Sequence, residues 1–157
     1  MKKTLIIKRI IFGSLLLFTF GLIFYYSNSN GNSSHGLSEK VTRIIADILH
    51  LTENNREVFI SNAEPYIRKF AHFSIYALAG IWEMLFLNTF NIKDEKKLFL
   101  GALIGIVYAL SDEFHQSFTP GRSPKIIDIV IDSEGNLFGN LFILLFIIFI
   151  RNKKEEA

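Results

Sequence analysis

The sequence predicts an all-α integral membrane protein: a four-helix bundle with a short exported segment that contains an amphipathic helix. Half of the 157 residues are hydrophobic, and sixteen of them are Phe. Four apolar stretches are long enough to cross a bilayer core of about 30 Å, which takes roughly 20 residues at about 1.5 Å each. Clusters of basic residues alternate with these stretches in the way that membrane topology requires.

The predicted spans cover residues 10–26, 70–90, 98–118 and 126–150. Basic residues precede the first span, occupy the loop after the second and follow the last: Lys2, Lys3, Lys8, Arg9; Lys93, Lys96, Lys97; Arg151, Lys153, Lys154. With four spans, all three clusters fall on one side, which the positive-inside rule makes cytoplasmic. We therefore expect a multi-pass protein of the cell membrane with both termini in the cytoplasm.

The chain divides into an N-terminal transmembrane anchor (1–26), an exported linker and amphipathic helix (27–64), a three-span core (65–150) and a cytoplasmic tail (151–157). The first span starts like a secretory signal, with basic residues before an apolar run. It ends in two tyrosines at 25–26, which are typical of a membrane interface, and no small-residue cleavage pattern follows. We predict a retained anchor; cleavage, the alternative, would leave the remaining topology unchanged.

The exported segment has two parts. Residues 27–36 are polar and contain glycine, so we expect a linker without structure of its own. The apolar residues that follow recur with helical spacing: Leu37, Val41, Ile44, Ile45, Ile48 and Leu49. This amphipathic helix either rests on the outer leaflet or packs on the rim of the bundle, and the pattern favours neither.

Two local signals concern helix ends and helix packing. Residues 61–64 (Ser-Asn-Ala-Glu) have capping-box spacing before Pro65, so we expect the helix of the second span to begin there. Two pairs of glycines lie four residues apart, Gly101/Gly105 and Gly135/Gly139. Small residues at this spacing let transmembrane backbones approach closely, and we expect both pairs to be packing faces.

Ionisable side chains gather at one end of the second, third and fourth spans. Inside a bilayer they cost roughly 2.5–3.5 kcal/mol each, which makes them candidates for function. Counting along each helix places His72 about 6 Å, Asp112 about 8 Å and Asp132 about 10 Å below the outer surface. Polar residues repeat every three or four positions, so each helix presents one polar stripe. The predicted pocket is lined by Arg68, Lys69, His72, Tyr76, Asp112, Glu113, His115, Gln116, Arg122, Asp128 and Asp132.

The cations of this set suit an anionic ligand. Arginine recognises phosphate with two parallel hydrogen bonds and lysine adds a point charge, so Arg68, Lys69 and Arg122 are candidate binding residues. The other candidate binding residues are Tyr76, Gln116, Asp128 and Asp132. The net charge of only +2 gives no reason to expect nucleic-acid binding.

A second group could perform acid–base chemistry. His72 and His115 titrate near neutrality, and Asp112 or Glu113 would orient them. No nucleophile motif is present, although Ser111, Ser117 and Ser123 are nearby in sequence. The histidines and carboxylates lack a recognised zinc spacing, and there is no cysteine, so we predict no metal site and identify no cofactor.

Four motifs carry a resemblance. R-K-x-x-H-F-x-x-Y (68–76), S-D-E-x-H-Q (111–116), P-G-R (120–122) and D-x-x-x-D-x-x-G-x-x-x-G (128–139) occur in the order and spacing of the VanZ-like family, over residues 65–140. Asp132 stands where that family commonly has Asn. The resemblance implies a small bacterial membrane protein of the cell envelope, from a family whose founding member is linked to teicoplanin resistance.

These observations leave three functions open. The first is a pocket that binds a cell-wall precursor, a lipid head group or a glycopeptide, and so affects susceptibility to teicoplanin-type antibiotics. The second is a membrane enzyme that acts on a phosphate-containing isoprenoid or another lipid-linked envelope substrate. The third is a structural network in which the polar groups satisfy one another and hold the bundle together.

Overall fold

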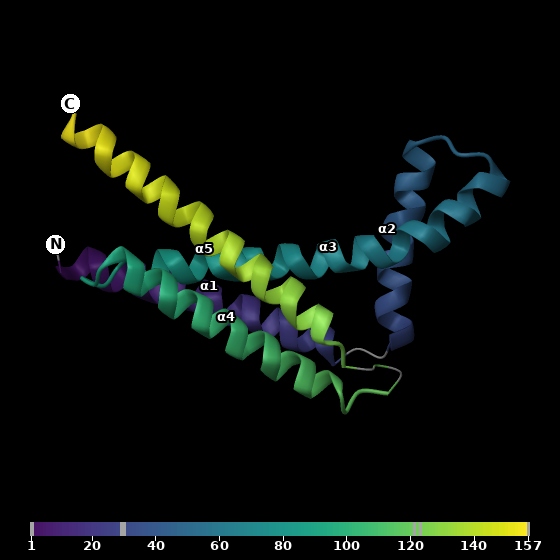
Figure 1. The fold of residues 1–157 in the computed structure, drawn as a ribbon, viewed down its shortest axis with the longest axis horizontal. Helices are drawn as coiled ribbons and strands as arrows, with labels where there is room; N and C mark the ends of the chain where they lie inside the picture. Colours follow the sequence, from purple (N-terminus) through teal and green to yellow (C-terminus); the bar gives the residue numbers. More distant parts are fainter. Residues whose placement is uncertain (1, 29–30, 121, 123, 157) are drawn as a thin grey trace.

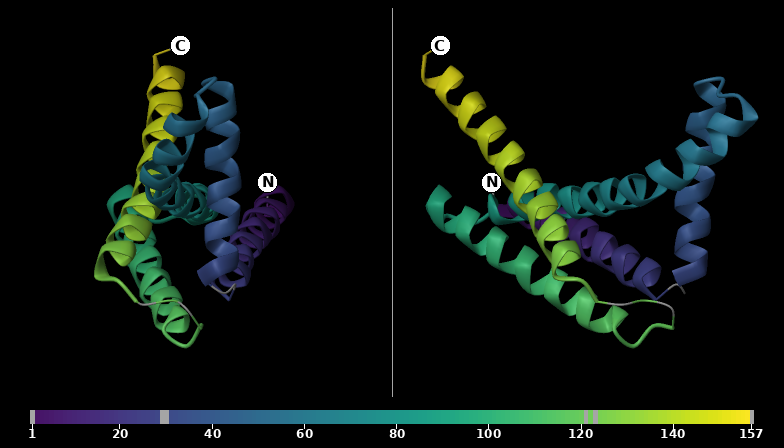
Figure 2. Two further views of the ribbon diagram at one scale, coloured as in Figure 1. Left: turned by 90° about the vertical axis from the view of Figure 1, so that its right-hand side faces the viewer. Right: turned by 45° about the vertical axis from the view of Figure 1, so that its right-hand side comes forward.

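The computed structural model describes residues 2–28, 31–120, 122 and 124–156, with the backbone alone over 31–35. These residues form five α-helices: α1 (Lys2–Ser27), α2 (Gly31–Ile48), α3 (Glu53–Leu87), α4 (Asp94–Gln116) and α5 (Ile126–Glu155). The helices α1, α3, α4 and α5 are long and apolar enough to cross a membrane. They run along the long axis of the molecule, whereas α2 stands across that axis at one end (Figures 1 and 2). The predicted all-α fold class with four candidate spans is confirmed.

The linker is shorter than predicted. The backbone is helical from Gly31, so the expectation that residues 27–36 have no structure of their own is wrong from that residue onward. Residue 27 belongs to α1, and residues 29–30 lie outside the described part of the chain. The reason is local: this polar segment lacks proline, and glycine and serine lower the stability of a helix without forbidding it.

The start of α3 was also predicted wrongly. The helix begins at Glu53, with Thr52 as the N-cap residue, and continues through Pro65. Glu64 therefore lies inside the helix, and its carboxylate accepts a hydrogen bond from the Ser38 hydroxyl of α2. A proline inside a helix removes one backbone hydrogen bond and bends the axis. The first turns of α3 accordingly lean away from the rest of the helix (Figure 1).

The helices α3 and α5 cross in close contact, and glycine makes this approach sterically allowed. A Cβ atom on Gly139 would lie 2.0 Å from the carbonyl oxygen of Ala77, and one on Gly135 would lie 2.4 Å from that of Phe73. On the facing helix, a Cβ atom on Gly80 would lie 2.1 Å from a backbone oxygen of α5. The prediction that the second glycine pair is a packing face is confirmed.

The three basic clusters meet at one end of the bundle, here called the basic end. Arg9 donates hydrogen bonds to the side chain (3.2 Å) and the carbonyl (3.0 Å) of Thr89 in the loop after α3. Arg151 of α5 forms an ion pair of 2.8 Å with Asp94 at the start of α4. The opposite end, where α2 lies, is here called the α2 end. The first turns of α1 and the last turns of α5 lie toward the basic end (Figure 1). The cytoplasmic location of this end stays a prediction from the charge pattern.

Candidate binding site

At the α2 end, Asp112 is the centre of a buried hydrogen-bond cluster. The Ser27 hydroxyl donates to Asp112 Oδ1 over 2.5 Å. The Gln116 amide donates to Asp112 Oδ2 and to Ser27 Oγ, both over 2.9 Å. Each of the three side chains is less than 8% exposed. Asp112 and Gln116 thus share one helix face, as their four-residue spacing predicts, and they join α4 to the end of α1.

His72 and Asp132 form the second polar contact of the site. His72 Nδ1 of α3 lies 3.5 Å from Asp132 Oδ1 of α5, a distance of an ion pair rather than of a short hydrogen bond. Asp132 is 2% exposed, whereas about a third of the His72 side chain is exposed. Tyr76, one turn further along α3, is fully buried and packs toward Tyr108, with 6.1 Å between ring centroids.

A cavity of about 400 Å³, here called the main cavity, opens beside these groups. Its walls come from the end of α1, the start of the amphipathic part of α2 and the middle of α3: Ile23, Tyr26, Ser27; Leu37, Ser38, Val41; Ile67, Arg68, Phe70, Ala71, His72, Ile75. Arg122, from the connection between α4 and α5, completes the lining. The walls are mostly apolar, and the ionisable side chains among them are Arg68, His72 and Arg122.

Arg122 is held in place at the edge of the main cavity. Its guanidinium donates a hydrogen bond of 3.2 Å to the carbonyl oxygen of Tyr26. Burial lowers the pKa of Arg122, and the charge of Arg68 acts in the same direction, while Asp112 opposes both. An arginine nevertheless stays protonated in proteins, so the cavity keeps this positive charge at every physiological pH. The backbone N–H of Arg122 donates to the carbonyl oxygen of Thr119 over 3.2 Å, as in a tight turn; Gly121 lies outside the described residues.

A smaller cavity of about 310 Å³ lies between α1 and α4. His115 lines it and stacks on Phe24, with 4.5 Å between ring centroids, and Asp112 also contributes to its wall. Of the hydrogen-bonded pair, Ser27 therefore lines the main cavity and Asp112 lines the smaller one. The structure does not bring His115 into the main cavity with His72, although the sequence grouped the two.

Six of the residues predicted to line the pocket line neither cavity: Tyr76, Gln116 and Asp132, described above, and Lys69, Glu113 and Asp128. Glu113 is buried and accepts the backbone N–H of Lys125 over 2.5 Å, so it holds the start of α5. Asp128 is half-buried and lies close enough to Glu113 and Arg122 to act on them electrostatically. Lys69 is exposed.

The geometry offers little support for a metal or a serine nucleophile. Within the described part of the chain, no three His, Asp or Glu side chains are close enough together to hold a metal ion. The hydroxyls of Ser111 and Ser117 donate to helix carbonyls over 2.7 and 2.6 Å, and both residues are exposed. Ser123 lies outside the described residues.

Sequence reasoning missed two features of the site. Ser27 was assigned to the linker, although it continues the face that Thr19 and Ile23 bury at four-residue intervals. The other feature is the asparagine pair of a second polar cluster in the middle of the bundle, where Glu83 Oε2 accepts from Asn136 Nδ2 (3.0 Å) and Asn140 Nδ2 (3.2 Å). All three side chains of this cluster are fully buried.

The glycines of α4 make room for this second cluster. A Cβ atom on Gly105 would lie 2.2 Å from Asn136 Oδ1, and one on Gly101 would lie 2.5 Å from Asn140 Oδ1. The first glycine pair is thus a packing face, as predicted, but it receives asparagine side chains rather than a helix backbone. The signal in the sequence was the four-residue step from Asn136 to Asn140, in register with the two glycines.

The fold is that of an all-helical protein with four helices long and apolar enough to cross a membrane, and with a mostly apolar cavity at one end that Arg68, His72 and Arg122 also line. The profile of the VanZ/LLP1 family matches residues 12–149, most of the chain. The chain therefore belongs to the VanZ/LLP1 family, in agreement with the resemblance of its four motifs. No curated protein and no solved structure matches the chain.

Proposed function

We propose that this protein binds an anionic, lipid-linked molecule of the bacterial cell envelope in the main cavity, and so changes susceptibility to teicoplanin-type glycopeptides. The observation that carries the proposal is the lining of that cavity, in which Arg68, His72 and Arg122 stand among apolar walls. A phosphate head group suits the arginines, and a hydrocarbon chain suits the walls. The volume of about 400 Å³ is within the range of small-molecule sites.

The carboxylates of the site support this assignment, because they are engaged behind the cavity lining. Asp112 accepts hydrogen bonds from Ser27 and Gln116, and Asp132 pairs with His72. Both are almost fully buried. These contacts occupy the carboxylates within the protein, while the two arginines line the cavity.

The envelope setting rests on two further arguments. The positive-inside rule puts the basic end in the cytoplasm and the α2 end, with the main cavity, on the outer side. Family membership connects the chain to the founding VanZ phenotype. A pocket that holds a wall precursor or lipid head group at the outer face would alter the access of a glycopeptide to its target without any chemical step.

A membrane enzyme acting on a phosphate-containing isoprenoid or lipid-linked substrate is the alternative, and the His72–Asp132 contact favours it. A carboxylate beside an imidazole is the arrangement that orients a general base. The two functions respond differently to substitution. An enzyme loses all activity in His72→Ala, whereas a binder loses affinity by similar steps in His72→Ala, Arg68→Ala and Arg122→Ala.

The direct test is binding to the full chain in lipid nanodiscs, measured by native mass spectrometry. The probes are a polyprenyl phosphate and the corresponding uncharged polyprenol. We expect the phosphate to bind at least about tenfold more tightly, and Arg68→Ala or Arg122→Ala to remove about 1.4 kcal/mol each. Lys125→Ala is the matched control, because this exposed cation lies at the same end outside the main cavity. Equal affinity for the two probes, or an equal loss in the control, contradicts the proposal.

The cellular test is teicoplanin susceptibility in a sensitive Gram-positive host. Intact protein is compared with His72→Ala and Asp112→Asn at matched membrane levels. Protection that both substitutions weaken supports the proposal. Protection that survives both substitutions, or no protection by the intact protein, separates the pocket from the antibiotic.

A further inference from the structure

The helix α2 is attached to α3 by its small and polar residues rather than by its apolar ones. Ser38, Thr42 and Ala46, four residues apart, are at most 8% exposed. The apolar residues of the neighbouring face are about half exposed or more: Leu37 (52%), Val41 (47%), Ile44 (58%) and Ile48 (69%). Their spacing places these four on one side of the helix. This apolar face is therefore not part of the protein core.

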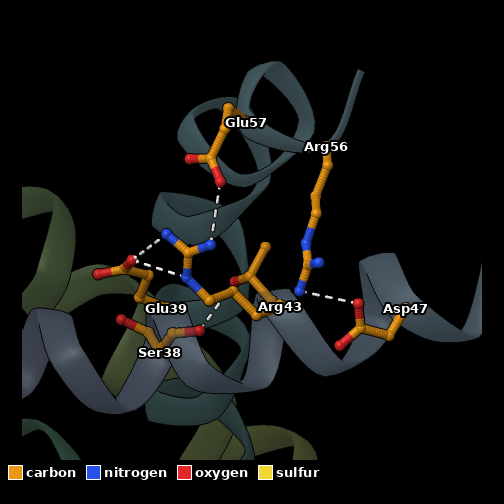
Figure 3. A network of polar contacts seen from close by, with 7 residues as sticks. Ser38, Glu39, Arg43, Asp47, Arg56 and Glu57 are labelled. Carbon is orange, nitrogen blue, oxygen red and sulfur yellow. Dashed lines mark hydrogen bonds and ion pairs between the residues drawn. The ribbon is translucent and has the colours of Figure 1, made fainter. Parts of the chain in front are cut away.

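Polar contacts on the remaining faces fix the rotation of α2 about its own axis. Arg43 forms ion pairs with Glu39 (2.8 Å) and with Glu57 of α3 (3.0 Å), and Asp47 pairs with Arg56 of α3 over 2.8 Å (Figure 3). The Ser38 hydroxyl donates to the buried Glu64 carboxylate. Each exposed pair contributes little alone. Together with the buried contact, they determine which side of α2 stays uncovered.

The uncovered side contributes two of its four apolar residues to the main cavity. Leu37 and Val41 line the main cavity together with Ile67, Phe70 and Ile75 of α3. These α3 residues lie in a candidate span. The helix α2 stands across the long axis of the bundle at the α2 end (Figures 1 and 2).

We propose that the apolar face of α2 is embedded in the lipid leaflet at the α2 end, and that the main cavity opens into this leaflet below α2. A helix with this orientation next to four spans meets lipid with its apolar face. The charged residues that follow Ser38 on α2 are two acids and two bases: Glu39, Lys40, Arg43 and Asp47. Because these charges balance, burial of the apolar face rather than attraction to anionic lipid holds α2 in the leaflet. The ligand of the cavity is then a resident of the leaflet and not a soluble anion; this last step rests on the proposed function.

The depth of α2 can be measured directly, because the chain contains no cysteine. Single cysteines at Ile44 and Ile48 carry spin labels in vesicles, and the exposed Lys40 on the charged face is the matched control. We expect the first two labels to be relaxed several-fold more by oxygen than by a water-soluble nickel complex, and the Lys40 label to show the reverse. Access of nickel to Ile44 and Ile48 overturns the proposal. Spin–spin broadening between copies also overturns it, because a second copy would then cover the face.

The route of entry has a separate readout. A cavity that opens into the leaflet retains a bound, labelled polyprenyl phosphate when millimolar inorganic phosphate is added to the water. It exchanges the labelled molecule for unlabelled polyprenyl phosphate that is added to the same bilayer. Val41→Trp, at the cavity wall, slows this exchange at least tenfold, whereas Ile44→Trp, on the same face outside the lining, leaves it unchanged. Displacement by inorganic phosphate contradicts leaflet entry while the binding function stands. Absence of any phosphate-dependent binding defeats the proposed function, and the depth of α2 is still decided by the spin labels.

Discussion

Ser27, the last residue of α1, donates a hydrogen bond to Asp112 of α4, with 2.5 Å between the two oxygens. The other buried residues of α1 are Thr19 and Ile23. The Tyr108 hydroxyl adds a bond of 2.6 Å to the carbonyl of Phe20. The first span thereby reaches the site and supplies part of the cavity wall. This helix is therefore a component of the pocket.

We expect the Ser27–Asp112 bond to couple the two helices energetically. Ser27→Ala and Asp112→Asn should each lower the free energy of unfolding by about 1–2 kcal/mol, with a coupling energy of roughly 1 kcal/mol in a double-mutant cycle. Unfolding by SDS can be followed by the fluorescence of Trp82, the single tryptophan. Ser74→Ala is the control, since this exposed serine bonds only within its own helix. Additive effects of the two changes would show that the bond is not formed in the membrane.

The buried Glu83 is expected to act as a hydrogen-bond acceptor rather than as a charge. Glu83→Gln keeps a carbonyl oxygen facing Asn136 and Asn140, so we expect a change within about 1 kcal/mol. Glu83→Ala removes the acceptor and leaves a cavity, which should cost about 2–5 kcal/mol in the same unfolding assay. A Gln variant as unstable as the Ala variant would mean that the negative charge itself is required.

The glycines predict a graded response to one added methyl group. Gly139→Ala should destabilise the bundle by about 1–3 kcal/mol or more, because its Cβ would lie 2.0 Å from a rigid backbone oxygen. Gly105→Ala should cost less, since the atom it meets belongs to the Asn136 side chain. Gly21→Ala is the control: nothing lies within 4 Å of its Cβ, and alanine should favour the helix by up to about 1 kcal/mol. Thermal unfolding in nanodiscs measures the order.

Adjacent cations in α3 should differ in their effect on binding. Arg68 lines the main cavity, whereas Lys69 is exposed and lines neither cavity. We expect Arg68→Ala to weaken the binding of a polyprenyl phosphate about tenfold, and Lys69→Ala to change it less than about twofold at physiological salt. An equal loss of affinity in the two variants would mean that Lys69 contributes to binding, as the sequence motif predicts. The ligand would then be attracted by the overall positive charge of this region rather than by a defined pocket.

The orientation of the chain can be tested with single cysteines at exposed positions. Thiols at Lys40 and Lys125, at the α2 end, should react with an impermeant reagent in intact cells, and a thiol at Lys96, at the basic end, should react only after permeabilisation. Labelling in the reverse pattern would place the main cavity in the cytoplasm and remove the argument from the cell wall. Labelling at all three sites would indicate mixed insertion.

The elements that the sequence predicted best are those with a long periodic signal. The four spans and the exposed apolar stripe of α2 follow from hydropathy, because a bilayer requires about 20 apolar residues whatever the remaining structure is. Helix ends were harder to predict. The spacing of Ser61 and Glu64 resembles a capping box, yet both lie inside α3, where the Ser61 hydroxyl bonds to Val58 and Glu64 contacts Ser38. A tertiary contact replaced the local one.

The sequence by itself determined the class of protein, the family and the layer in which polar groups gather, because depth along a helix follows from residue count. Only the tertiary structure decided which of those groups meet. It brought Ser27 to Asp112, paired His72 with Asp132 and separated His72 from His115, since these contacts depend on the rotation and crossing of helices. That geometry is determined by close packing, above all where Gly135 and Gly139 let α5 lie against the backbone of α3.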